Sequence, residues 1–150
     1  MLSAWSFNLF LLRSLPLAWI AGLKVQKLSR AGCTCSVPMK HWTKNPFRSI
    51  YFAAQAMAAE LSTGALVLYA TQGNGPSMST LVTGMRATYH KKATERIYFT
   101  CSDGEAIAKA IQEAQQSGNA VQLVCRSEGR TKEGVLVAHM EFQWSVKART

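Results

Sequence analysis

The chain has 150 residues, 48% of them hydrophobic, and a formal net charge of +9. This length is enough for one domain with a real core and too short for two ordinary ones. The positive charge predicts an anionic partner, but the basic residues are scattered, without a dense tract or a zinc-finger or RNP motif, which argues against nucleic acid.

Two apolar runs, Trp5 to Leu12 and Leu15 to Leu23, predict a pair of short amphipathic helices. Arg13 and Pro16 interrupt them, and each run is shorter than the ~20 residues that a membrane span requires. No basic region precedes the first run, so a signal peptide is not expected either. We expect residues 1–30 to form a helical extension that packs on the domain or covers a ligand mouth. A peripheral membrane anchor stays open as an alternative.

Residues 31–150 are expected to form a single domain that begins with a strand through Cys33 and Cys35. These two cysteines share one face of that strand, roughly 6–7 Å apart, which is poor geometry for a disulfide. The other cysteines, Cys101 and Cys125, complete no Cys-x-x-Cys motif, and the three histidines lack ligand spacing. No metal site is therefore predicted. Reduced cysteines favour a cytoplasmic location.

A long central helix is predicted to run to Tyr69, with Ser49 as its N-cap. The helix is apolar nearly all round, so we expect it to be buried. Glu60 lies in its alanine-dense part, and burying a carboxylate costs several kcal/mol unless it is paired or neutralised. Glu60 is therefore the first functional candidate. The alternative is a structural acid that pairs with Arg86 or Arg48.

The rest of the chain predicts strands with one helix between them. Residues 78–89 alternate with a period of two, and we expect this strand to pair with the segment 96–101 as a hairpin. Ser102-x-x-Glu105 has the form of a capping box, and it opens a helix that ends at Gly118. The last two strands are predicted at residues 121–127 and 135–146. Short connections favour an antiparallel sheet.

Three positions carry a motif: Tyr51-Phe52 lies six residues after Asn45, and Glu60 lies nine residues after Tyr51. This spacing resembles that of hotdog-fold thioesterases of the phenylacetate-pathway type, in which Asn, His-Gly and Asp or Glu occupy the same intervals. The chain is also similar to a related branch of hotdog proteins, through Gly22-Leu23-Lys24-Val25, Glu60-Leu61-x-Thr63-Gly64 and the capped helix at 102–118.

The resemblance implies an α+β hotdog fold, an antiparallel sheet wrapped around a long central helix, with an extra helix inserted between strands. It also implies hydrolysis of an acyl-CoA or acyl-carrier thioester, with coenzyme A as part of the substrate and no other cofactor. Glu60 would be the general base or nucleophile, and Asn45 would position the water or the thioester. The backbone N–H near Phe52 would polarise the carbonyl, and Thr63 could share the water of Glu60.

Other functions stay open because Tyr51-Phe52 replaces His-Gly. The chain could be a non-catalytic hotdog module that binds acyl-CoA or another apolar ligand. Tyr51 could donate a hydrogen bond or serve as a core anchor. Gln55 is expected as an amide at an interface or at the rim of the site rather than as a catalytic group. His90, Lys91 and Lys92 could bind the phosphates of coenzyme A or form a solvated turn.

The helical geometry also predicts an oligomer. If the helix extends back to Tyr51, nine residues at about 100° each place Tyr51 opposite Glu60. One helix cannot then supply both groups to a single site. The resemblance implies that two protomers share each site, so we expect a homodimer or a dimer of dimers.

Overall fold

The structure is a computed structural model that describes residues 4–72 and 75–149. The chain forms, in order, α1 (Ala4–Ser14), α2 (Pro16–Ile20), β1 (Lys24–Leu28), β2 (Cys33–Val37), α3 (Phe52–Ala70), β3 (Met78–Tyr89), β4 (Ile97–Cys101), α4 (Gly104–Ser117), β5 (Val121–Arg130) and β6 (Leu136–Ala148). The strands make one antiparallel sheet in the order β1-β2-β4-β5-β6-β3.

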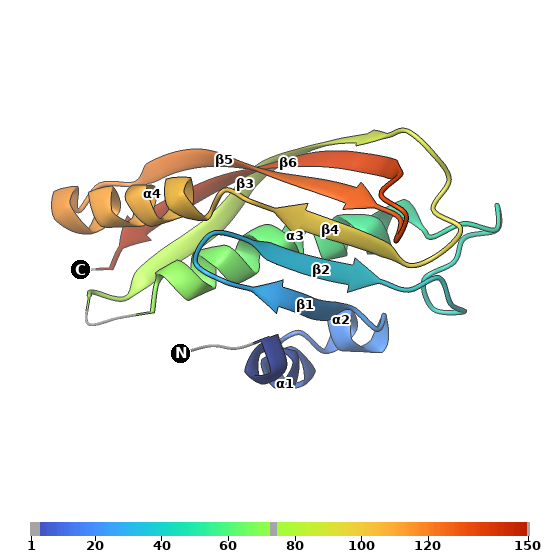
Figure 1. The fold of residues 1–150 in the computed structure, drawn as a ribbon. Helices are drawn as coiled ribbons and strands as arrows, with labels where there is room; N and C mark the ends of the chain where they lie inside the picture. The colour runs from blue at the N-terminus through green and yellow to red at the C-terminus, as the bar shows by residue number, and fades with distance from the viewer. Residues whose placement is uncertain (1–3, 73–74, 150) are drawn as a thin grey trace.

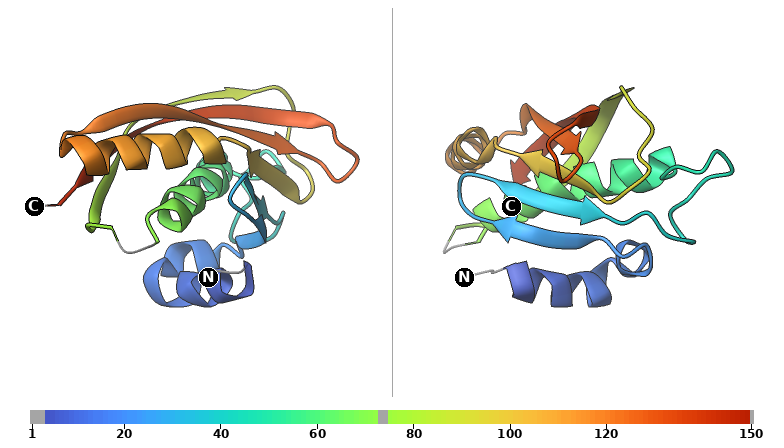
Figure 2. Two further views of the ribbon diagram at one scale, coloured as in Figure 1. Left: turned by 60° about the vertical axis from the view of Figure 1, so that its left-hand side comes forward. Right: turned by 45° about the vertical axis from the view of Figure 1, so that its right-hand side comes forward.

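The sheet curls around α3, as Figures 1 and 2 show. This helix packs against β2, β4 and β5, and the core between the layers includes Leu66, Phe99 and Phe142, each almost fully buried. Helix α4 covers the ends of β5 and β6, while α1 and α2 lie beyond β1. The predicted α+β arrangement, with an inserted helix and N-terminal helices, is confirmed.

Helix α1 is attached to the sheet by one buried face and one asparagine. Phe7 and Leu11 lie one turn apart, and both are buried. The Asn8 side chain donates to the Val25 carbonyl oxygen at 3.0 Å and accepts from the Val25 N–H at 2.9 Å. A single side chain thus caps the outer edge of β1 with the two hydrogen bonds that another strand would have made.

Residues 24–28 form a strand, and placing them in a helical extension was wrong. Lys24 and Lys27 are exposed and Val25 is buried, so this short strand offers too little apolar alternation to reveal itself in the sequence. The sheet therefore begins before residue 31. The wider division into an extension and a domain stays a prediction.

Helix α3 begins at Phe52 rather than after Ser49. Tyr51 is the N-cap, with an extended backbone and no capping bond from its side chain. The side-chain oxygen of Asn45 instead accepts bonds from both the N–H and the hydroxyl of Ser49, each at 3.2 Å. These bonds keep Ser49 in the preceding loop, where Arg48 adopts a positive φ of 61°.

The predicted hairpin between residues 78–89 and 96–101 was wrong, because β3 pairs with β6 and β4 lies between β2 and β5. Strand β6, with 13 residues, matches the 12 of β3, whereas β4 has only 5. Pairing with β6 therefore satisfies the backbone of β3 over its whole length. The capping box did not form, since Asp103 is the N-cap without a capping bond, but Gly118 ends α4 with a φ of 70° as predicted.

A β-bulge in β3 reverses which side chains face the helix. Val82 lies opposite Trp144 and Gly84 opposite Gln143, so Thr83 has no partner in β6. An extra residue moves every later side chain to the other face. Met85 therefore lies on the same face as Phe142, although it is 51% exposed because β3 is an edge strand. The strict alternation predicted for this strand holds only on either side of the bulge.

Candidate active site

A cavity of about 520 Å³ opens at the start of α3. Its walls are the loop before α3, the first turn of that helix and the segment that follows β3. The predicted site residues that line it are Asn45, Tyr51, Phe52, Gln55, His90, Lys91 and Lys92. The structure thus brings together residues that are up to 47 positions apart in the sequence.

Asn45 organises the loop with its oxygen and keeps its amide hydrogens available. The oxygen accepts from the Phe47 N–H at 3.0 Å and from Ser49. The NH₂ group of Asn45 has no hydrogen-bond partner among the residues that the structure describes. Because an amide NH₂ has two donors, Asn45 can donate to an oxygen of a ligand without disturbing the loop.

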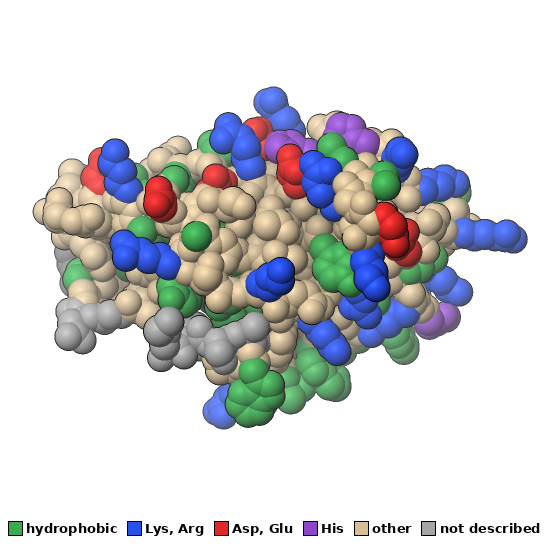
Figure 3. All heavy atoms as spheres, viewed as in Figure 1, with side chains coloured by type: hydrophobic (Ala, Val, Ile, Leu, Met, Phe, Trp, Pro, Cys, Tyr) green, Lys and Arg blue, Asp and Glu red, His purple; other side chains and the backbone are tan. Residues whose placement is uncertain are grey.

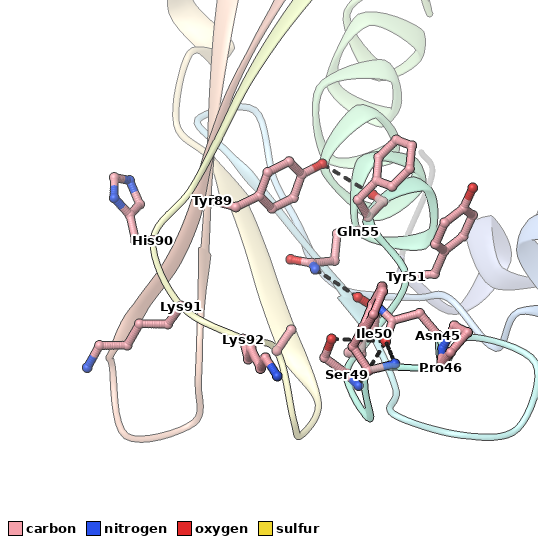
Figure 4. Close-up of a pocket in the computed structure, with 13 residues that line it drawn as sticks. Asn45, Pro46, Ser49, Ile50, Tyr51, Gln55, Tyr89, His90, Lys91 and Lys92 are labelled. Atoms are coloured by element: carbon pink, nitrogen blue, oxygen red, sulfur yellow. Dashed lines mark hydrogen bonds between the residues drawn. The ribbon is translucent and has the colours of Figure 1, made fainter.

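Gln55 lies under the cavity with an unsatisfied acceptor. Its side-chain N–H₂ donates to the Ile50 carbonyl oxygen at 3.1 Å, and this bond fixes which end of the amide is oxygen. The oxygen is buried and has no partner among residues 4–72 and 75–149, and Figure 4 shows it pointing toward the segment after Tyr89. Leaving such an acceptor unpaired costs about 1–3 kcal/mol. The side chain is only 4% exposed, so Gln55 is not a rim residue.

The start of α3 offers a further donor. The Tyr51 N–H donates to the Thr43 carbonyl oxygen at 2.7 Å, but the Phe52 N–H has no partner in the described part of the chain. The first N–H groups of a helix point outward and carry partial positive charge. An oxyanion at the mouth of the cavity can therefore be met by backbone as well as by Asn45.

The basic segment after β3 forms the outer wall. Sequence analysis did not single out Tyr89, which belongs to this wall and whose hydroxyl donates to the Phe52 carbonyl oxygen at 3.3 Å. Burial raises the pKa of Tyr89. In Figure 4 the side chains of His90 and Lys91 point away from Gln55, so they form the outer rim of the cavity rather than its floor.

Glu60 does not line this cavity. It follows Gln55 by five residues, which places it about 7.5 Å further along the helix and about 140° around it. There it belongs to a partly exposed stripe of α3 that the sheet leaves uncovered, composed of Ala53, Ala56, Met57, Glu60 and Gly64. The predicted base and the predicted substrate pocket therefore lie on different sides of one helix.

The Glu60 carboxylate is half-buried and unpaired. It makes no ion pair and no side-chain hydrogen bond within the described residues, so the structural pairing with Arg86 or Arg48 does not form in this chain. Burial raises the pKa of Glu60 above its ordinary value of 4.5. One carboxylate oxygen lies over Gly64, where an added Cβ would be 3.0 Å from it. The absence of a side chain at Gly64 makes room for the carboxylate.

Thr63 lies beneath Glu60 and is fully buried. Its hydroxyl donates to the Glu60 carbonyl oxygen at 2.9 Å and accepts from the indole N–H of Trp144 at 3.0 Å. The threonine therefore links the turn that carries Glu60 to β6. Sequence analysis placed Trp144 only among the inward residues of a strand, because nothing local to it indicates a partner 81 residues away.

None of the described helices is long and apolar enough to cross a membrane. The four cysteines are free and buried, and the described residues contain no cluster of His, Cys, Asp and Glu that could hold a metal ion.

The fold is similar to that of several solved bacterial proteins, which shows the architecture alone. A Pseudomonas aeruginosa protein, PA5026, called a "Probable Thioesterase", is 20% identical over 96% of this chain and 95% of its own, with a TM-score of 0.82. Thioesterase HI1161 from Haemophilus influenzae is 13% identical over 99% and 92%, with a TM-score of 0.71.

A third structure, SAV0944 from Staphylococcus aureus, is called a thioesterase enzyme and was solved with one glutamine replaced by alanine. It is 14% identical over 88% of this chain and 98% of its own, with a TM-score of 0.66. The same protein was also solved with one glutamate replaced by alanine. No curated protein matches the chain.

The long helix, the sheet that wraps it and these structural likenesses agree on one fold. A family model described as "Domain of unknown function (DUF4442)" matches residues 3–146, nearly the whole chain. The predicted resemblance to hotdog proteins is thereby confirmed. The chain belongs to the DUF4442 family and has the hotdog fold of thioesterase-like proteins.

Proposed function

We propose that the protein hydrolyses an acyl-CoA or acyl-carrier thioester, with Glu60 as the general base or nucleophile. The observation that carries this proposal is the carboxylate of Glu60, which is half-buried, unpaired within the described chain and has a raised pKa. A carboxylate in such a setting is a stronger base than an exposed one and can take a proton from water. No ion pair with a described residue accounts for its burial.

A spacing supports the same assignment. The glutamine and glutamate replaced in SAV0944 lie 15 residues apart in that protein, and Asn45 and Glu60 lie 15 residues apart here. Both proteins thus have a side-chain amide and a carboxylate at the same interval on the same fold. This agreement supports a shared arrangement in which the amide polarises the carbonyl and the carboxylate is the base.

In the proposed reaction Glu60 removes a proton from water, and the oxygen of that water attacks the thioester carbonyl carbon. The C–S bond then breaks, and the thiolate leaves as a thiol after taking up the proton. The amide of Asn45 and the Phe52 N–H stabilise the oxyanion. Thr63 holds the turn of Glu60, and Tyr51 lies at the cavity mouth. If Glu60 acts as a nucleophile, its carboxylate attacks the thioester carbonyl carbon and the C–S bond breaks, so that the thiolate leaves and an acyl-enzyme anhydride forms, which water then hydrolyses.

The proposal needs two protomers, since the cavity and Glu60 lie on different sides of α3. The uncovered stripe of α3 has small side chains at Ala53, Ala56 and Gly64, which permit close approach of another backbone. We propose a homodimer, or a dimer of dimers, in which Glu60 of one protomer meets the Asn45 loop of the other. Lys91, Lys92 and His90 at the outer wall would then meet the phosphates of coenzyme A.

The free cysteines suit the reducing cytoplasm, where we place this activity.

The test is a hydrolysis screen across acyl-CoA chain lengths with the wild type and Glu60→Gln. We expect kcat to fall by about 10²–10⁴ in the variant, the usual contribution of a general base. Glu133→Gln, at an exposed turn, is the matched control and should turn over substrate like the wild type. Equal turnover by Glu60→Gln would contradict the catalytic assignment.

One observation favours a second function. Phe52, 57% exposed, occupies the place of the glycine in the thioesterase motif, where its side chain limits how closely a carbonyl can approach the backbone. A non-catalytic module would bind acyl-CoA saturably while the wild type released no free thiol. Isothermal calorimetry run beside the hydrolysis screen separates the two functions.

A further inference from the structure

Helix α1 exposes a broad apolar face to solvent. At 100° per residue Trp5, Leu9 and Leu12 fall on one side of the helix, opposite the buried Phe7 and Leu11. Trp5 is 78% exposed and Leu9 is 57% exposed. The helix is therefore apolar on both sides, and only one of them is covered by the sheet.

Helix α2, which contacts α1, continues this surface. Leu17 is 66% exposed, Trp19 54% and Ile20 50%, while Ala18 faces the protein. We define the N-terminal apolar face as Trp5, Leu9, Leu12, Leu17, Trp19 and Ile20. So many exposed apolar side chains on two contacting helices are rare on soluble monomers and mark a place where something else binds.

The charges around this face have one sign. Residues 1–59 contain seven lysines and arginines and no aspartate or glutamate, so all eight acidic residues lie from Glu60 onward. Arg13 lies in the last turn of α1, and Lys24 and Lys27 are exposed on β1, next to α1. The Lys40 ammonium lies against Gly22 after α2, 2.5 Å from where a Cβ would be. In Figure 3 the lower part of the molecule shows green and blue atoms without red ones, while the red atoms and further blue atoms lie in the upper part.

We propose that the N-terminal apolar face docks on an anionic phospholipid membrane, with α1 and α2 lying in the plane of the interface. Tryptophans prefer the boundary between headgroups and acyl chains, and basic residues at the rim are attracted to anionic lipid. Since none of the described helices can cross the bilayer, the protein lies on the membrane. This proposal requires neither Glu60 nor the proposed thioesterase activity.

A second copy of the chain is a less suitable occupant. Two copies that met through this face would bring their basic rims together without any acidic residue from residues 1–59 to offset the repulsion. An anionic lipid surface instead supplies the opposite charge on all sides of the apolar residues. The positive charge around the N-terminal apolar face therefore favours an anionic membrane over a second copy of the chain.

The test is cosedimentation of the full chain with vesicles of phosphatidylcholine alone or mixed with phosphatidylglycerol. We expect binding to the mixed vesicles, a loss of binding at high salt and a blue shift of tryptophan fluorescence as Trp5 and Trp19 leave water. Leu9→Asp and Leu17→Asp should each weaken binding roughly tenfold or more. Val135→Asp, an exposed apolar position at the β5–β6 turn, is the matched control and should bind like the wild type.

A second pair of variants tests the charges. Lys24→Gln with Lys27→Gln should reduce binding roughly tenfold or more, while Lys109→Gln with Lys132→Gln, on exposed sites of α4 and the β5–β6 turn, should not. The proposal is overturned if mixed vesicles do not bind the protein, if neutral vesicles bind it equally, or if both lysine pairs act alike. If the protein self-associates in the absence of vesicles and Leu9→Asp abolishes that association, the face binds a second copy of the chain. This result would also overturn the membrane proposal.

Discussion

At the scale of single residues, burial without a partner makes Glu60 pH-sensitive. Its pKa in the folded protein is raised above the ordinary 4.5 because the surroundings disfavour the charge. The folded state then holds the proton more tightly than the unfolded state. The contribution of Glu60 to stability is therefore most favourable below about 4.5 and is lost as the pH rises through the folded pKa.

Glu60→Gln should remove this dependence because glutamine does not titrate. We expect the free energy of unfolding of the variant, relative to the wild type, to increase as the pH rises from about 4 to about 8. Urea unfolding followed by circular dichroism across that range measures the difference. A difference that stays constant with pH, or that shrinks as the pH rises, would show that Glu60 is not destabilised by its charge.

Replacing Gly64 with alanine should change stability and activity in opposite directions. Replacing a glycine inside a helix with alanine stabilises the helix by about 1 kcal/mol. At Gly64, however, the new methyl group would lie 3.0 Å from a Glu60 carboxylate oxygen and 3.5 Å from the Trp144 ring. The carboxylate must move, whereas the contact with the ring is an ordinary one.

Gly64→Ala should therefore raise the thermal midpoint and lower kcat for thioester hydrolysis by roughly tenfold or more, since a base displaced by a fraction of an ångström loses its alignment. Differential scanning calorimetry and steady-state kinetics measure the two effects. Gly118→Ala, at the open C-terminal end of α4, is a control for activity: its φ of 70° strains alanine, so it should lose stability and keep kcat. An unchanged kcat in Gly64→Ala would show that this glycine is not needed to position Glu60.

At the scale of the elements, α3 and β5 are joined by two buried hydroxyls. Ser62 donates to the Ala59 carbonyl oxygen at 2.7 Å, and its oxygen lies 2.8 Å from the Ser127 hydroxyl. Since the hydrogen of Ser62 is used within the helix, Ser127 must donate to Ser62. Both serines are fully buried, so neither has water as a substitute.

If Ser127 donates to Ser62, replacing each serine with alanine should lower the free energy of unfolding by a different amount. Ser62→Ala leaves the Ser127 hydroxyl as an unpaired buried donor, at about 1–3 kcal/mol. Ser127→Ala leaves Ser62 bonded to Ala59 and should cost only about 1 kcal/mol, the worth of one hydrogen bond. Equilibrium unfolding of the two variants and of the double variant measures the asymmetry. Equal costs, or a larger cost for Ser127→Ala, would contradict this direction of the hydrogen bond.

The elements also show what the sequence could predict. Long periodic segments such as α3, α4 and β6 were predictable because their burial pattern repeats over several turns or pleats. Strand β1 was not, because its five residues carry one buried side chain. The pairing of β3 with β6 was missed because the choice between two partners depends on their lengths and on the whole sheet. The only local sign of the bulge at Thr83 is the glycine that follows it, Gly84.

For the candidate site the same division holds. Asn45, Tyr51-Phe52 and Glu60 could be found by spacing, and the lysines after β3 by their charge. The unpaired oxygen of Gln55 and the bond from Trp144 to Thr63 could not, because each depends on atoms brought together by the tertiary fold.

At the scale of the whole molecule, the proposed site requires residues from two chains. A mixing experiment can test this sharing. Asn45→Asp keeps the oxygen that binds Ser49 but removes the amide donors, and Glu60→Gln removes the base. Each variant alone should be almost inactive.

Mixed and allowed to exchange subunits, the two variants should recover about one quarter of the wild-type rate, because about half of the dimers would be mixed and each would contain one intact site. The rate of thiol release measures the recovery, with size-exclusion chromatography as the control for pairing. If both groups acted within one protomer, no mixture would recover activity.

The position of β3 has a consequence for the newly made chain. This strand is complete at Tyr89, but within the described chain its partner is β6, which ends at Ala148. At about 5–20 residues per second, an emerging chain waits several seconds before β3 can join the sheet, and Val82 and Ala87, which pack against the core in the folded chain, are unprotected meanwhile. Such distant pairing slows folding. The sheet can therefore be completed only after β6, the last strand, has been synthesised.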